Sequence, residues 1–168
     1  MGTSDRMADK AMDVYLNDHL AGAMLGSDLA GQLRDRETDA SRCERLTGIA
    51  ADIDADRETL LELMESLDVS RNPVKQVSGW LSEKASRVKF SGASSGEPDH
   101  GAFMARETLR LGVAGKKCLW LALKEARGAY PQLNDVDLDR LIDRASTQED
   151  QLERERIAAA ERTLIGGR

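Results

Sequence analysis

The feature that most constrains the fold is a set of apolar residues that recur every three or four positions through almost the whole chain. Such spacing places the apolar residues on one face of an α-helix. Five stretches show it, and most of the breaks between them contain glycine, proline or serine. The predicted helices are 9–36, 40–67, 73–90, 101–129 and 135–164. The sequence therefore predicts an all-α fold of four long helices, with one additional short helix between the second and third of them.

The composition agrees with an all-α fold. Hydrophobic residues make up 40% of the 168 residues, whereas aromatic residues make up only 4% and prolines number 3. Sheets are enriched in aromatic and β-branched residues, so this composition favours helices built on leucine, alanine, isoleucine and methionine. The length is that of one domain with its own core. We expect a single domain over residues 1–168, with residues 1–8 frayed and residues 91–98 forming a linker loop.

Charge and cysteine content limit the classes of partner. The net charge is −6 with a pI near 5.0, and an acidic chain repels phosphate backbones, so we expect no nucleic-acid partner. No apolar run approaches the roughly 20 residues of a membrane span, and the start of the chain has no leader pattern, so we expect a cytoplasmic protein with no membrane partner. The two cysteines, Cys43 and Cys118, are too few for a disulfide framework.

The predicted helix 101–129 carries two apolar lines. The longer line falls at helical spacing and is taken as the main stripe: Phe103, Glu107, Leu111, Ala114, Cys118 and Leu121. A second line of Leu109, Val113 and Trp120 lies on another side. A helix that is apolar on two sides packs against two partners, which we expect to be the bundle and helix 73–90. Cys118 is then inert in the core, and the small residues from Gly112 to Gly115 allow close helix packing rather than phosphate binding.

Several polar side chains fall on predicted core faces: His19, Asp56, Arg57, Glu107, Gln148, Glu149 and Arg156. Their burial is costly unless they are paired. The height of a residue along the bundle axis can be estimated by counting residues back from the turn that joins two antiparallel helices. With turns near residues 38 and 131, His19 is level with residue 57, and Glu107 is level with Arg156. We therefore predict a buried ion pair at each level. The alternative is a reduced metal site for iron or manganese, formed by His19, Asp56 and Glu149.

The helix layout and some short stretches of the chain resemble those of a known group of proteins. The opening Tyr15–Asp18, the acidic stretch Asp52–Leu61, a short third helix and two further long helices are similar to the ferritin-like superfamily. Within it, the bacterial YciE/YciF-type stress proteins are the most similar. The resemblance covers the layout of nearly the whole chain. It implies a ferritin-like four-helix bundle, dimerisation and a stress-related role.

The chain departs from that family where metal ligands are expected. Ferritin-like bundles hold two metal ions with two Glu-x-x-His pairs and further carboxylates. Here the one such string is Glu97–His100, which lies in the break between the predicted helices 73–90 and 101–129 and contains Pro98. The first helix has no carboxylate from His19 to Met24, and the last lacks the family's adjacent glutamates at Ile142–Thr147. We therefore assign no cofactor and no catalytic residue, and expect the chain to purify without stoichiometric metal.

Three functions remain open from the sequence. The leading hypothesis is a non-catalytic bundle that acts through protein–protein contacts, as a homodimer with an unidentified protein partner. The alternative is a metal-binding oxidoreductase with the reduced site described above. The third is a carrier of a small ligand inside the bundle, which an internal cavity on the order of several hundred cubic ångströms would favour.

Overall fold

The computed structural model describes residues 3–71 and 98–166, and in these residues every regular element is helical. The elements are α1 (Thr3–Arg36), α2 (Ala40–Ser66), α4 (Pro98–Ala126), the 3₁₀ helix η1 (Pro131–Asp135) and α5 (Leu138–Leu164). The predicted helix 73–90 and residues 91–97 of the predicted linker lie outside the described residues. The four long helices form a bundle, which confirms the predicted all-α fold.

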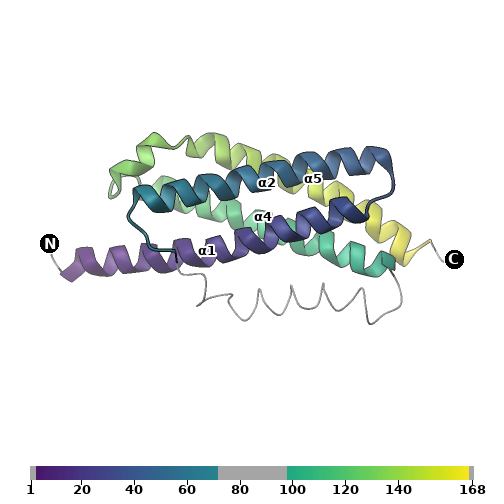
Figure 1. Ribbon diagram of the computed structural model, residues 1–168, viewed down its shortest axis with the longest axis horizontal. Coiled ribbons are helices and arrows are strands. Elements are labelled where there is room, and N and C mark those ends of the chain that lie inside the picture. The colour runs from purple at the N-terminus through teal and green to yellow at the C-terminus, as the bar shows by residue number, and fades with distance from the viewer. Residues whose placement is uncertain (1–2, 72–97, 167–168) are drawn as a thin grey trace.

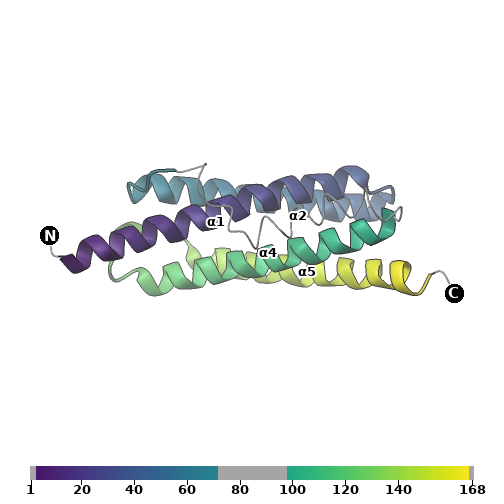
Figure 2. The same cartoon turned by 90° about the horizontal axis from the view of Figure 1, so that it is seen from below.

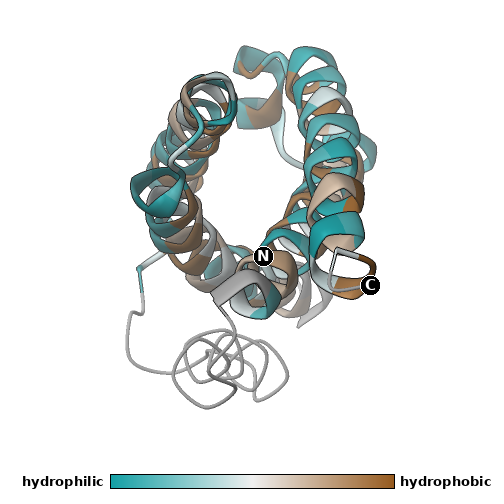
Figure 3. Cartoon of the chain, turned by 90° about the vertical axis from the view of Figure 1, so that its right-hand side faces the viewer, coloured by the Kyte–Doolittle hydropathy of each residue, from teal (hydrophilic) through white to brown (hydrophobic). Residues whose placement is uncertain are grey.

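The bundle consists of two antiparallel hairpins, α1 with α2 and α4 with α5 (Figure 1). A view from below shows α1 crossing close to α4 as well (Figure 2). Glu37, at the end of α1, binds Arg106 near the start of α4. The helices α2 and α4 therefore run in the same direction, and α2 ends at the opposite end of the bundle from where α4 begins. Seen end-on, the four helices surround one common axis (Figure 3).

Local signals set several helix ends. Asp39 caps α2 by accepting a hydrogen bond from the Arg42 amide (2.9 Å), and Asp137 caps α5 through the Arg140 amide (3.0 Å). After α2 the chain turns at Asp68, whose φ is 56°, and the Val69 amide then bonds to the Met64 carbonyl (2.8 Å). Pro131 does not continue a helix but begins the 3₁₀ turn.

Three helix starts differ from the prediction. The helix α1 begins at Thr3 rather than residue 9, because polarity alone does not exclude a helix. The helix α4 begins at Pro98 rather than residue 101, since proline is well tolerated in the first turn. The last helix begins at Leu138 rather than 135, because residues 131–135 form the 3₁₀ turn. In the described residues, no helix is long and apolar enough to cross a membrane.

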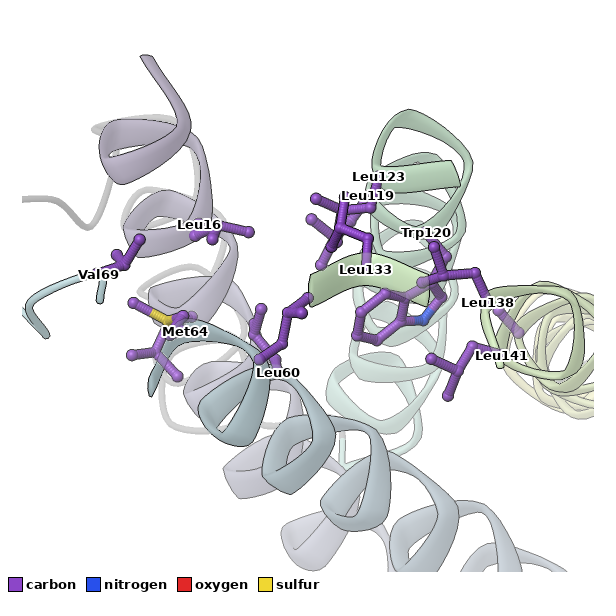
Figure 4. Close-up of a cluster of buried hydrophobic side chains, with 13 residues drawn as sticks. Leu16, Leu60, Met64, Val69, Leu119, Trp120, Leu123, Leu133, Leu138 and Leu141 are labelled. Carbon is purple, nitrogen blue, oxygen red and sulfur yellow. The ribbon is translucent and has the colours of Figure 1, made fainter. Parts of the chain in front are cut away.

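The core consists of two clusters along the bundle axis. The first is centred on Trp120, which is fully buried, and includes leucines of all four helices and Leu133 of η1 (Figure 4). The second lies toward the α1–α2 turn and includes Leu33, Ile49, Leu109 and Leu152. Trp80, the other tryptophan of the chain, lies outside the described residues.

The structure reverses the predicted roles of the two apolar lines of α4. Leu109, Val113 and Trp120 are buried, whereas no residue of the expected main stripe is, and Leu121 and Cys118 are exposed. The helix α4 packs against α1 and α5, and the line that faces the interior between them is the shorter one. The expectation that Cys118 lies in the core was therefore wrong.

Candidate functional site

A buried carboxylate lies at the middle of the bundle. Asp56 falls between Ile53 and Leu60 on the buried face of α2, and only 1% of its surface is exposed. Its Oδ1 accepts a hydrogen bond from Arg144 of α5, and its Oδ2 accepts one from Lys116 of α4. Gln148 of α5 donates a further bond to Oδ2 (3.3 Å) and accepts one from Lys116 (2.5 Å). This polar layer of Asp56, Lys116, Arg144 and Gln148 joins three helices.

The polar layer carries an excess of positive charge. It contains one carboxylate and two cations, and the exposed fractions of their side chains are 1% for Asp56, 14% for Lys116 and 22% for Arg144. Burial lowers the pKa of the Lys116 ammonium from its ordinary value, and the charge and hydrogen bond of Asp56 oppose that shift. The layer therefore pairs every charge, but it leaves a local net charge of +1 inside the bundle.

Beside the polar layer lies a pocket of about 330 Å³, enclosed by α1, α2 and α4. Its wall is largely apolar and includes Leu25, Leu29, Ile53, Leu60, Leu109 and Val113. Asp56 and Lys116 line it as well, so the polar layer forms part of its surface. At its rim, Asp18, Asp28 and Gly112 are exposed to solvent, and the pocket is therefore not sealed. Its volume is at the lower end of that of small-molecule sites.

Two glycines of α4 help to keep this pocket open. A Cβ atom at Gly112 or at Gly115 would meet no neighbouring atom within 4 Å, and both glycines line the pocket. The prediction that these small residues allow close helix packing was therefore wrong. They face empty space, and glycine within a helix is destabilising by about 1 kcal/mol relative to alanine.

His19 lines the same pocket from α1. Its ring makes an edge contact with Tyr15, with 4.6 Å between the ring centroids. Burial lowers the pKa of His19 from its ordinary value, against the opposing charge of Asp18, so the imidazole is neutral at pH 7. His19, Asp56 and Arg57, which helix heights predict to lie at one level, all line the pocket. The partners of Asp56, however, are Lys116, Arg144 and Gln148.

The structure does not bring together the three residues of the alternative metal site. Glu149 does not line the pocket, and its carboxylate lies 3.1 Å from Arg110 and 3.9 Å from Lys117. Asp56 is already compensated by two cations. Across residues 3–71 and 98–166, no group of three or more His, Cys, Asp or Glu side chains is placed to hold a metal ion.

The predicted pair of Glu107 and Arg156 forms, but it is not buried. The two side chains approach to 3.7 Å, and 38% of the Glu107 side chain is exposed. Arg156 makes its shorter contacts with Glu153 (2.7 and 2.9 Å). The expectation of a buried pair was wrong because Glu107 lies on the outer line of α4. Such an exposed pair contributes about 0–1 kcal/mol.

A second ionic cluster lies at the α1–α2 turn, and the sequence did not reveal it. Glu37 accepts hydrogen bonds from Arg42 (3.1 Å), from Arg106 (2.9 Å), and from the amides of Thr38 and Asp39 (3.0 and 3.1 Å). The exposed fractions of the side chains are 8% for Glu37 and 4% for Arg106. Nearby, Glu155 of α5 accepts a hydrogen bond from Arg45 of α2 (2.7 Å).

Sequence spacing contained a signal for two of the missed residues. Arg106 and Lys116 continue the buried line of Leu109, Val113 and Trp120 at steps of three or four residues. Choosing the other line of α4 as the core face concealed both.

Comparison of the chain with protein-family models, with curated proteins and with solved structures gives no match.

Proposed function

We propose that the chain is a non-catalytic helical bundle that binds a small, mainly apolar molecule in the pocket between α1, α2 and α4. The observation that carries the proposal is the pocket itself. It combines about 330 Å³ of space, a mainly apolar wall and a few polar groups, which is the make-up of small-molecule sites. Of the three functions left open by the sequence, the small-ligand carrier is the one that this pocket favours.

The metal-binding oxidoreductase is less favoured because of its donor set. The buried carboxylate of the pocket, Asp56, already accepts hydrogen bonds from two cationic side chains and one amide. A metal ion would have to displace Lys116 or Arg144, and would leave a cation buried without its partner. Glu149, the further ligand of that hypothesis, is bound to Arg110 instead.

Membership of the ferritin-like superfamily is also proposed. Its support is the connectivity of the helices. Two antiparallel hairpins follow each other, and the second and third long helices, α2 and α4, are parallel. Ferritin-like bundles, which have one long crossover connection, share this arrangement. The resemblance to stress proteins remains a proposal of the same kind.

The two pocket glycines give the first test. Replacing Gly112 and Gly115 together by alanine is expected to raise the free energy of unfolding by about 1–2 kcal/mol, because each new Cβ meets open space and alanine favours the helix. The same change is expected to weaken binding of an apolar probe such as decanoate, because the methyl groups enter the pocket. Urea denaturation and calorimetric titration measure the two effects.

Gly48→Ala is the matched control. Gly48 is an exposed glycine within α2, and a Cβ there also meets nothing within 4 Å, but it does not line the pocket. It should stabilise the chain without changing binding. If Gly48→Ala and the double variant had the same effect on binding, the glycines of α4 would not belong to the ligand site.

Protein–protein contact, through a homodimer, is the second candidate function. It is favoured by large apolar side chains that are exposed on α1 and α4. These are Val14 (44% exposed) and Met24 (51%) of α1, and Leu121 (44%) of α4. Sedimentation at micromolar concentration tests it. A 36.8 kDa species, twice the mass of the 18.4 kDa chain, is expected. A single species of 18.4 kDa would rule the homodimer out.

A further inference from the structure

The polar layer also indicates what kind of ligand fits the pocket, an inference that rests on the proposed ligand-binding function. A lysine ammonium has three N–H donors and no acceptor. Lys116 uses one donor for Asp56 and one for Gln148. Its third donor has no protein partner in the part of the chain that is described, and Lys116 lines the pocket. The inner surface of the pocket can therefore donate a hydrogen bond to a ligand.

The buried carboxylate of Asp56 is less available to a ligand than the third N–H of Lys116. Asp56 already accepts three hydrogen bonds, from Arg144, Lys116 and Gln148. Within the polar layer itself the net charge is positive, because Lys116 and Arg144 outnumber Asp56. Asp52, one helical turn before Asp56 on α2, is partly exposed and acts on Lys116 through its charge without a hydrogen bond. A negative group placed beside Lys116 would neutralise this excess charge next to an ammonium that is 14% exposed.

The other charged groups around the pocket lie at its rim. Arg57 is paired with Asp54 (3.4 Å) and Glu58 (2.9 Å). Asp18 and Asp28 are exposed, so water screens their effect on a group deep in the pocket. His19 is neutral at pH 7. Lys116 is therefore the strongest recognition element that the pocket offers.

We propose that the pocket binds an apolar monocarboxylate, with its hydrocarbon part against the leucines of α1 and α4 and its carboxylate accepting the third N–H of Lys116. The size of the pocket sets the scale of the ligand. Its volume is about twice that of a cavity of roughly 150 Å³ that holds benzene. A hydrocarbon chain of about ten carbons, or two fused rings, is of suitable size.

The test is calorimetric titration of the full chain with three probes of equal length: decanoate, decanol and decylamine. Decanoate is expected to bind about tenfold or more tightly than either of the others, because it alone forms a charge-assisted hydrogen bond with Lys116. In Lys116→Gln, checked for folding by circular dichroism, decanoate and decanol are expected to bind within about threefold of each other. If that variant does not fold, the three-probe comparison on the wild-type chain still decides.

A pair of glycine variants tests whether the probes bind in the pocket. Gly112→Leu is expected to abolish binding of all three probes by filling the pocket at its rim, whereas Gly48→Leu on the exposed face of α2 is expected to leave binding unchanged. Equal binding of decanoate and decanol to the wild-type chain would overturn the carboxylate proposal and leave the ligand-binding function standing. Tightest binding of decylamine would also overturn it. Failure of all three probes to bind, or binding that Gly112→Leu does not reduce, would contradict both the carboxylate proposal and the ligand-binding function.

Discussion

Asp56→Ala is expected to lower the free energy of unfolding by about 3–5 kcal/mol. The substitution removes the one carboxylate of the polar layer and leaves Lys116 and Arg144 close together and poorly solvated, with 14% and 22% of their side chains exposed. Because the total stability of a domain is about 5–15 kcal/mol, the loss would be a large fraction of it. Urea denaturation followed by circular dichroism measures it.

Glu107→Ala is the control for Asp56→Ala. It also removes the carboxylate of an ion pair with an α5 arginine, but this pair spans 3.7 Å and 38% of the Glu107 side chain is exposed. Its expected effect is below about 1 kcal/mol. A triple variant with Asp56→Leu, Lys116→Met and Arg144→Met should recover most of the stability lost in Asp56→Ala, since no buried charge is then left alone. Similar losses in Asp56→Ala and Glu107→Ala would show that the polar layer is not energetically distinct from the surface.

Glu37→Gln is expected to destabilise the chain by about 3 kcal/mol at pH 7. Burial of Glu37 raises its pKa, but the hydrogen bonds from Arg42 and from the Asp39 and Thr38 amides, with the charge of Arg42, outweigh this and hold it at about 2, below the ordinary 4.5. Glutamine preserves the size of the side chain and removes the negative charge.

The pH dependence of Glu37→Gln follows from the sign of that shift. A carboxyl group whose pKa is lower in the folded chain stabilises folding above its unfolded pKa, and this contribution is lost as the pH falls through the folded pKa. The difference between wild type and variant should therefore be fully present above about pH 4.5, and should disappear as the pH falls toward about 2. Asp35→Asn is the control, because Asp35 is an exposed carboxylate next to the same turn. A Glu37→Gln difference that did not change between pH 7 and pH 2 would contradict this account.

The helical architecture was predictable because the signal is repeated many times along each helix. Leu46, Ile49, Ile53 and Leu60 define one face of α2, and the sequence therefore indicated Asp56, together with its neighbour Arg57, as polar residues on that face. Helix starts were less predictable. One depended on a proline, Pro98, that can either begin a helix or belong to a loop, and the sequence did not distinguish the two.

The partners of Asp56 were harder to predict. Helix heights led to His19 as a neighbour of Asp56, and both line the pocket, but heights do not report how each helix is rotated about its own axis. On α4 two apolar lines competed, and the longer one proved to face outward. Lys116 therefore escaped notice, although it continues the line of Val113 and Trp120. The pocket is a property of the packing of three helices, and no local pattern in one helix encodes it.

The most direct test of the central claim, that the pocket is a ligand site, is a methyl NMR experiment on the full chain with decanoate. Cross-relaxation between the decanoate chain and the methyl groups of Ile53, Leu60 and Val113, which line the pocket, is the predicted result. The methyl groups of Leu46, Leu138 and Leu141, which are buried elsewhere in the core, should show none. Contacts only with exposed side chains such as Ile157 and Leu164, or no contacts at saturating decanoate, would contradict the claim.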